Sequence, residues 1–355
     1  MKTQVFVILV SIAVFYFTQK FSSKSYSVKY HDMSVAKFVK NPNPFPTFFL
    51  SHGGPTFMYE DDEFGNKGAW NITRTLGQTI KNKWKPDYII VVSAHWQSSG
   101  RNSVEIAVPS DGEDQNALIY DFYGFPDYMY KEKFRTKCSK FLANDVKEHL
   151  KAGGFHTTLS KRGIDHGVWV PLKVAFSEDS SVKEPEAINK LDLPDTSLIQ
   201  VSLTYTDDFE TNFRLGELLS NYTNNLLWDE KRGKYLKGLI ICSGMSVHNL
   251  RDLGIAFLKP GHVMPYVRPF NSILTETLYN SPNVLAGLQE LRRKHNSLMF
   301  QAHPTLEHFL PIVVASGIHN ECGGSIKELY TDSQASLGWN IYQFGDDYIC
   351  ETRKL

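Results

Sequence analysis

The feature that most constrains the fold is an alternation of short apolar runs with longer amphipathic stretches. The apolar runs are rich in β-branched and aromatic residues and occupy residues 47–51, 88–93, 103–108, 198–203 and 237–242. Each run is bounded by Gly, Pro, Asp or Ser, which is typical of buried strands. Apolar side chains recur at helical spacing in residues 129–152, 210–227, 268–295 and 306–316. Strands alternating with helices predict an α/β fold, with a mostly parallel central sheet covered by helices on both faces.

The chain is long enough to form one large domain. It has 355 residues, of which 42% are hydrophobic, and it contains no internal repeat. We expect an N-terminal hydrophobic segment over residues 1–20, a polar linker over 21–43 and a single catalytic domain over 44–355. The charged, proline-containing stretch at residues 178–196 is predicted to be a surface loop.

Composition argues against several kinds of partner and site. Lys plus Arg and Asp plus Glu number 38 each, and no basic block occurs, so no nucleic-acid partner is expected. The four cysteines, Cys138, Cys242, Cys322 and Cys350, show no Cys-x-x-Cys spacing. We therefore interpret them as free thiols rather than as zinc ligands or a disulfide framework.

Residues 5–17 form a continuous apolar run preceded by Lys2. A helix of this length spans about 20 Å, which is short of the roughly 30 Å hydrocarbon core of a bilayer. The run fits a signal-peptide core, a short signal anchor or a mitochondrial presequence. Because no small-x-small cleavage site follows, we expect an uncleaved anchor that tethers the chain to a membrane or directs it to the secretory pathway. A mitochondrial or cytoplasmic location is the alternative, and the sequence leaves the oligomeric state open.

Two histidines stand where strands are predicted to end. His52 follows residues 47–51 and precedes Gly53-Gly54-Pro55, and His95 follows residues 88–93. In open α/β sheets ligands bind beyond the carboxyl ends of the strands, so the two imidazoles are expected to converge. Neutral imidazole suits zinc, iron, copper and nickel better than calcium or magnesium. The pattern predicts a mononuclear metal site, with ordinary loop histidines as the alternative.

Three further histidines have related contexts. His248 follows another predicted strand and could act as a metal ligand, a general base or a donor to a developing oxyanion. His166 follows Asp165, a carboxylate that could orient it. His308 follows Glu307. Adjacent residues on one helix would not both face a small ion, so either the imidazole or the carboxylate, but not both, could point inward. A purely structural histidine is the alternative at each position.

Other motifs narrow the chemistry. The aromatic stretch at residues 120–126 could line a pocket for a planar ring, or could simply be a packed turn. No Gly-x-Gly-x-x-Gly follows a strand and no phosphate-binding Gly-x-x-x-x-Gly-Lys-Ser/Thr is present, so no nucleotide cofactor is expected. The Gly-x-Ser-x-Gly elbow of serine hydrolases does not occur either.

Taken together, these segments resemble the class III extradiol ring-cleavage dioxygenases, and most of all the branch called DOPA 4,5-dioxygenase-like. The segments that carry the resemblance stand in the family's order at residues 51–55, 93–96, 120–126, 165–169, 243–251 and 304–311. It covers roughly residues 46–350. Gly54 departs from the family, in which serine is frequent at that position, and residues 261–301 match only loosely.

The resemblance implies a three-layer α/β sandwich with one divalent metal ion, Fe(II) for ring cleavage or alternatively Zn(II). Carried over by motif, His52, His95 and His308 would be metal ligands. His248 would be a fourth ligand or the catalytic base, and His166 would assist proton transfer or hold a substrate oxygen.

The activity implied by the resemblance is opening of the ring of a catechol, such as DOPA, by O2 to give a muconic semialdehyde. The expected partners are therefore a small-molecule catechol and O2. The same scaffold could alternatively serve a non-catalytic metal-binding or signalling protein, or a zinc hydrolase, because fold alone does not fix function. Redox-active iron and O2 uptake would separate these readings.

Overall fold

The computed structural model describes residues 35–177, 189–258 and 261–346. The hydrophobic run at residues 5–17 lies outside the described residues, and so does Cys350. Within the described ranges, no helix combines the length and apolar character needed to cross a membrane. The membrane tether therefore stays a prediction. Cys138, Cys242 and Cys322 are free thiols, as expected.

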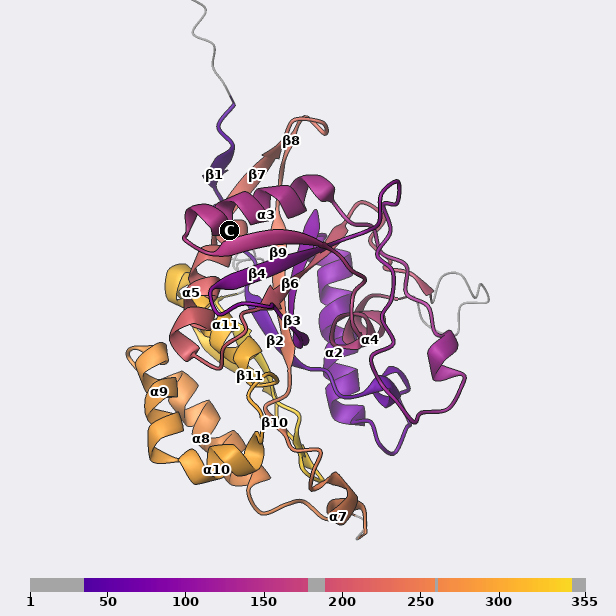
Figure 1. Cartoon of the computed structure of the whole chain (residues 1–355), viewed down its shortest axis with the longest axis vertical. Helices are drawn as coiled ribbons and strands as arrows, with labels where there is room; N and C mark the ends of the chain where they lie inside the picture. The colour runs from indigo at the N-terminus through magenta and orange to yellow at the C-terminus, as the bar shows by residue number, and fades with distance from the viewer. Residues whose placement is uncertain (1–34, 178–188, 259–260, 347–355) are drawn as a thin grey trace, which may run out of the picture. The chain divides into compact units, whose positions relative to one another are not determined.

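An eight-stranded sheet forms the centre of the unit that begins at Phe38 (Figure 1). In spatial order its strands are β11 (Ile326–Tyr330), β14 (Ile341–Phe344), β2 (Thr47–Ser51), β9 (Gly238–Gly244), β3 (Tyr88–Gln97), β6 (Ser197–Leu203), β4 (Ser103–Val108) and β5 (His156–Lys161). Strands β2, β9, β3 and β6 run parallel to one another, and so do β4 and β5. The β11–β14, β14–β2 and β4–β6 pairs are antiparallel. The mostly parallel sheet is thus confirmed.

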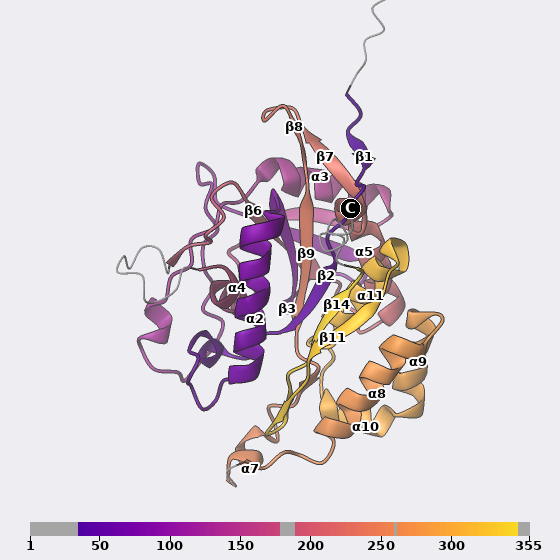
Figure 2. The ribbon, with the colours of Figure 1, turned by 180° about the vertical axis from the view of Figure 1, so that it is seen from behind.

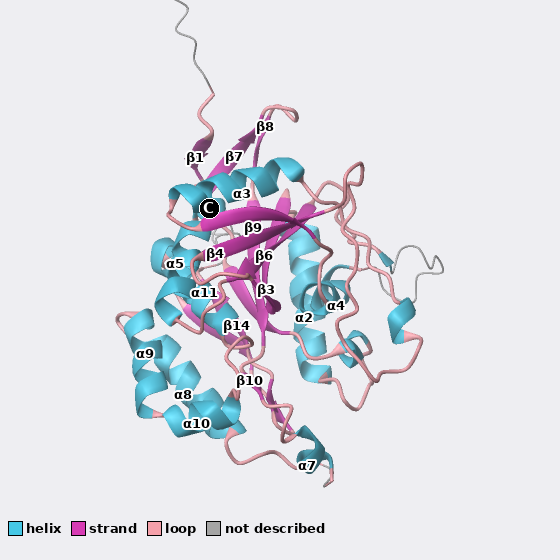
Figure 3. Ribbon diagram, viewed as in Figure 1, coloured by secondary structure: helices cyan, strands magenta, loops and turns pink. Residues whose placement is uncertain are grey.

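Side chains of β3 alternate between two separate cores. Ile90 and Val92 belong to one core, whereas Ile89 and Val91 belong to the other. Successive residues of a strand point to opposite faces, so each core covers one face of the sheet. The first core contains residues of α3 (Lys140–Ala152), α5 (Phe209–Leu219) and α11 (Leu310–Cys322), and the second contains residues of α2 (Lys67–Thr79) and α4 (His166–Phe176). Helices therefore cover both faces, which confirms the three-layer sandwich (Figures 2 and 3).

Smaller elements complete the unit. One three-stranded sheet has the order β1 (Phe38–Lys40), β7 (Asn225–Asp229), β8 (Lys234–Leu236), and another has the order β10 (Val247–His248), β13 (Leu337–Gly338), β12 (Ser333–Gln334). The other α-helices among the described residues are α6 (Asn221–Asn224), α7 (Leu253–Phe257), α8 (Val267–Asn280), α9 (Val284–Lys294) and α10 (Asn296–Ala302).

Several predicted boundaries differ from the structure. The predicted helical stretch at 268–295 is two helices, because Pro282 cannot continue α8 and the Asn283 side chain caps α9 by accepting from the Ala286 N–H at 2.9 Å. The stretch at 210–227 ends in the strand β7, and only the part of 129–152 that starts at Lys140 forms an α-helix. Residues 38–40, predicted to belong to a linker, form β1 and pair with β7.

Candidate metal centre

The histidines with strand-end contexts gather at the carboxyl ends of three neighbouring strands, β2, β9 and β3. His52 directly follows β2, and His248 lies in β10, shortly after β9. His95 lies within β3 rather than beyond it, in a segment where the pairing with β6 shifts register between Val92 and Gln97. Such a bulge turns a side chain away from the regular alternation of the strand. His166 is the first residue of α4, and His308 lies just before α11.

The ring nitrogens of three histidines meet at one point. Nε2 of His95 lies 3.0 Å from Nε2 of His52 and 3.2 Å from Nε2 of His308. The side chains come from segments far apart in the sequence, and His52 and His308 are buried. Three imidazole nitrogens at this spacing could all bind one metal ion.

The tautomer of His52 is set by its neighbours. Nδ1 of His52 lies 2.9 Å from Oγ of Ser243, and that hydroxyl donates its only hydrogen to the carbonyl of Gly167. Ser243 Oγ can therefore only accept, so the proton of His52 is on Nδ1. The Nε2 lone pair is left to face His95, as a metal ligand requires.

Carboxylates favour the same Nδ1–H tautomer in His308 and His95. Glu307 Oε1 lies 3.0 Å from Nδ1 of His308, and Asp121 Oδ2 lies 3.4 Å from Nδ1 of His95. A carboxylate beside Nδ1 favours the Nδ1–H tautomer, and such partners orient the histidine ligands of known metal sites. Glu307 and His308 thus do not compete for one position. Both residues precede α11, and the carboxylate contacts Nδ1 of the imidazole, on the side of the ring away from Nε2.

Burial keeps these rings uncharged. It lowers the pKa of His52 and of His308 well below 6.5, and the charges that neighbouring histidines would carry lower both pKa values further. Burial also lowers the pKa of His95, with a further contribution from His166. Neutral imidazole is the form that binds a metal, so the donor set fits a divalent ion near neutral pH.

His248 stacks on His308. The two ring centroids are 3.5 Å apart with an interplanar angle of 14°. Burial, followed by the charges of His303 and His166, lowers the pKa of His248 to about 3. Donor atoms of His248, Glu307 and His308 lie within 4.8 Å of one another, as do those of His52, His95 and His166. His248 could therefore be a fourth ligand or an uncharged base beside the ion.

His166 lies on the other side of His95, with ring centroids 4.0 Å apart. Asp121 Oδ1 is 2.9 Å from Nδ1 of His166 and accepts the backbone N–H of the same residue at 2.9 Å. Although burial favours its neutral form, the hydrogen bonds and charge of His166 lower the pKa of Asp121 to about 2. Asp121 is thus an anion shared between His95 and His166.

Sequence reasoning did not single out Asp121 or Ser243 as parts of the site. Asp121 lies inside the stretch at 120–126, in which only the aromatic residues suggested a role. That stretch does line the site: Phe122 is buried, and its ring and that of His166 form a T-shaped pair with centroids 5.7 Å apart. Tyr123, however, is 86% exposed. A lone serine in a strand carries no pattern from which its contact with His52 could be predicted.

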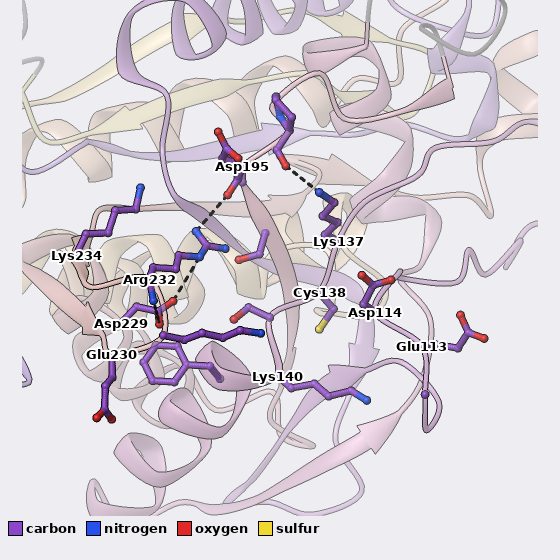
Figure 4. Close-up of a pocket in the computed structure, with 17 residues that line it drawn as sticks. Glu113, Asp114, Lys137, Cys138, Lys140, Asp195, Asp229, Glu230, Arg232 and Lys234 are labelled. Carbon is purple, nitrogen blue, oxygen red and sulfur yellow. Dashed lines mark hydrogen bonds and ion pairs between the residues drawn. The ribbon is translucent and has the colours of Figure 1, made fainter.

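A cavity of about 1140 Å³ lies near the amino ends of the parallel strands, at the opposite end of the sheet from the histidines (Figure 4). Its lining includes Ser197, the first residue of β6, which pairs with Tyr88 at the start of β3. Charged side chains of both signs surround it, and burial raises the pKa of its Cys138 thiol to about 11. A cavity at the amino ends of the strands, with an unreactive thiol, has no part in the histidine site.

Comparison with known proteins agrees with this geometry. A family model described as "Catalytic LigB subunit of aromatic ring-opening dioxygenase" matches residues 46–345. A 4,5-DOPA dioxygenase extradiol-like protein of Schizosaccharomyces pombe is 32% identical over 288 residues, which cover 77% of this chain and 84% of the relative. The 4,5-DOPA dioxygenase extradiol of Beta vulgaris is 33% identical over 292 residues, with 79% and 92% covered.

A solved structure shares the fold. The crystal structure of an uncharacterized protein from Escherichia coli K12 superposes with a TM-score of 0.59 at 23% identity, covering 85% of this chain and 100% of that one. The family model spans most of the sequence, and it includes every histidine of the site. The chain therefore belongs to the family of aromatic ring-opening dioxygenases represented by the catalytic LigB subunit.

Proposed function

We propose that the protein is a metal-dependent extradiol dioxygenase that opens the ring of a catechol with O2 to give a muconic semialdehyde. The observation that carries the proposal is the convergence of three Nε2 atoms at 3.0 and 3.2 Å. Each ring has a partner at Nδ1 that favours the metal-binding tautomer.

In this proposal His52, His95 and His308 hold one divalent ion through Nε2, and His248 is a fourth ligand or the base. When bound, Fe(II) would lower the pKa of a coordinated catechol hydroxyl and supply the redox chemistry that O2 requires. A site of few protein ligands leaves positions for substrate and O2.

The charge of the site suits an anionic substrate. The lowered pKa values of His52, His95 and His308 keep the ligands neutral, so they neither repel a divalent ion nor neutralise it as directly bound carboxylates would. A catecholate that binds there is stabilised electrostatically in a largely buried environment. Phe122, whose ring packs against His166, offers an apolar surface for the substrate ring.

His166 is placed to handle a substrate proton. Asp121 lies beside its Nδ1, so Nε2 is the nitrogen that can accept the proton of a hydroxyl. The anionic Asp121 would then stabilise the imidazolium that forms. His248 is the alternative base; burial lowers its pKa to about 3, so it is neutral but accepts a proton less readily than an ordinary imidazole does.

The test uses the full chain, purified without oxygen and loaded with Fe(II). We expect O2 uptake and a new visible absorbance with L-DOPA or another catechol, but none with L-tyrosine, whose single hydroxyl cannot chelate. Iron that binds without O2 uptake for any catechol would contradict the proposal and favour a binding or signalling role. A protein that does not bind Fe(II) but retains zinc would favour a zinc hydrolase over a dioxygenase.

A further inference from the structure

Asp165 is a buried carboxylate in an unusual position. It is the N-cap residue of α4, yet its side chain caps no backbone N–H of the helix, although aspartate at this position usually does. The first N–H of α4, that of His166, is accepted by Asp121 instead. The Asp165 side chain is 0% exposed, so its interactions with the protein must compensate for the loss of water.

The Asp165 carboxylate joins the start of α4 to two strands of the sheet. Oδ1 accepts from the Ser93 hydroxyl of β3 at 2.7 Å. Oδ2 accepts from the Gln200 amide of β6, and from Arg162 Nη1 at 3.2 Å. Gln200 returns a bond, since its Oε1 accepts the Asp165 N–H at 3.2 Å. Each oxygen of the carboxylate thus has a donor, and the groups hold one another in place.

Two of these contacts lead directly to the site. Ser93 Oγ, which donates to Asp165, accepts the backbone N–H of His95 at 3.2 Å, within the bulged part of β3. On the helix side, Asp165 is followed by His166 and Gly167. A Cβ added at Gly167 would lie 2.5 Å from Ser93 Oγ and 2.8 Å from Cδ2 of His95, so the first turn of α4 packs directly on these groups.

We infer that Asp165 is a positioning residue: through Ser93 and the first turn of α4, its carboxylate fixes His95 and His166 relative to one another. This inference rests on the proposed metal centre and deepens it. Asp165 touches neither the ion nor the substrate. Its effect is exerted on the direction in which Nε2 of His95 points and on the separation of the two rings.

The most informative variant is Asp165→Asn, tested in the full chain. The amide keeps an oxygen for Ser93 but places an NH2 group against the Gln200 Nε2 amide and Arg162 Nη1, which both donate to Asp165 in the unmodified chain. Partners that orient metal ligands typically change affinity by about 10–100-fold when they are mutated. We expect zinc affinity, measured by competition with a chelator, to fall about tenfold, and the visible spectrum of bound Co(II) to change.

A second substitution should reverse the effect. In Asp165→Asn/Gln200→Glu, the new carboxylate accepts from the amide introduced at position 165 and from Arg162, so donors and acceptors match again. We expect zinc affinity and the Co(II) spectrum to return towards those of the unmodified chain. If Asp165→Asn has a lowered zinc affinity and the double variant does not recover it, the lowered affinity does not come from the lost hydrogen-bond pairing. That result would overturn the inference.

Asp145→Asn is the matched control. Asp145 is also a buried carboxylate, but it accepts from the Tyr222 hydroxyl at 2.8 Å, and the Tyr222 carbonyl accepts in turn from Tyr88 at the start of β3, away from the site. This variant should lower the melting temperature and leave zinc affinity and the Co(II) spectrum unchanged. If Asp165→Asn behaves in the same way, Asp165 is merely structural.

Two outcomes separate this inference from the proposed function. If the unmodified chain binds neither zinc nor Co(II), the metal centre fails and the inference fails with it. If it binds both and Asp165→Asn binds them equally well, only the inference fails. Should Asp165→Asn not fold, Ser93→Ala removes the relaying oxygen alone, and unchanged zinc affinity in that variant would overturn the inference.

Discussion

The Glu307 carboxylate lies 3.0 Å from Nδ1 of His308, its neighbour in the sequence. The adjacent residues therefore have different tasks, since the imidazole faces His95 and the carboxylate fixes its tautomer. Removing the carboxylate in Glu307→Ala should weaken zinc binding about tenfold, as measured by chelator competition. Glu307→Gln keeps an acceptor oxygen and should bind nearly as the unmodified chain does. Equal affinity in Glu307→Ala would show that the carboxylate does not support His308.

Ligand and base should respond differently to substitution. His52→Ala removes one of the three converging Nε2 atoms and should abolish stoichiometric metal binding, as measured by metal analysis after dialysis. His166→Ala should retain the metal but lower kcat by roughly 10²–10⁴-fold, the usual contribution of a positioned acid or base. Full metal occupancy in His52→Ala would refute the ligand assignment.

Gly167 should tolerate no side chain. A Cβ there would lie 2.5 Å from Ser93 Oγ and 2.8 Å from the His95 ring, so Gly167→Ala should cost about 1–3 kcal/mol of unfolding free energy. Gly254 lies in α7 with no atom within 4 Å of an added Cβ, and Gly254→Ala should be neutral or slightly stabilising. Urea unfolding of both variants measures the difference. Equal unfolding free energies for the two variants would mean that α4 can shift away from Ser93 and His95 at little cost.

His303 should make the metal-free protein sensitive to acid. Burial lowers its pKa from 6.5 to about 4, although the bond from Nε2 to the Ser246 carbonyl at 2.8 Å raises it. Between pH 6.5 and 4 the unfolded chain binds a proton that the folded chain does not, so stability falls as the pH is lowered through this window. This single group can contribute a loss of about 3 kcal/mol.

The matched variant for this prediction is His303→Gln, whose amide can still donate to Ser246. The other buried histidines destabilise both proteins in acid, so the informative quantity is the difference in unfolding free energy between them at pH 7 and at pH 4. The variant should lose less stability than the unmodified chain. Identical pH profiles would contradict a lowered pKa for His303.

Much of the site could be predicted because strand ends leave a local pattern. An apolar run rich in aromatic or β-branched residues and followed by a histidine marks both the strand and the position of the histidine side chain, and this applies to His52. His95 shows where the pattern stops: the bulge within β3 depends on pairing with β6, which the sequence does not display. The partners Ser243 and Asp121 are single polar residues whose roles arise only from contacts across the fold.

Two missed strands of the central sheet, β5 and β11, have a similar explanation. Five of the six residues of β5 are polar, because β5 lies at the edge of the sheet and pairs with β4 alone. β11 likewise pairs only with β14. Edge strands need not be apolar on both faces, so they lack the continuous hydrophobic runs that identified β2 and β9. The break between α8 and α9, in contrast, was readable from Pro282 and Asn283.

The strand β1 limits how far the chain can be shortened from its N-terminus. β7 has β1 on one side and β8 on the other, and Asn41 is anchored just after β1 by a bond from its amide to the Thr223 carbonyl at 2.9 Å. A chain that starts before Phe38 retains the residues of all three strands of this sheet. Removal of residues up to or beyond Lys40 would expose the backbone donors and acceptors of β7, which could then pair with another copy of the chain. Chains shortened from the N-terminus should therefore begin no later than Phe38 if β7 is to keep β1 as its partner.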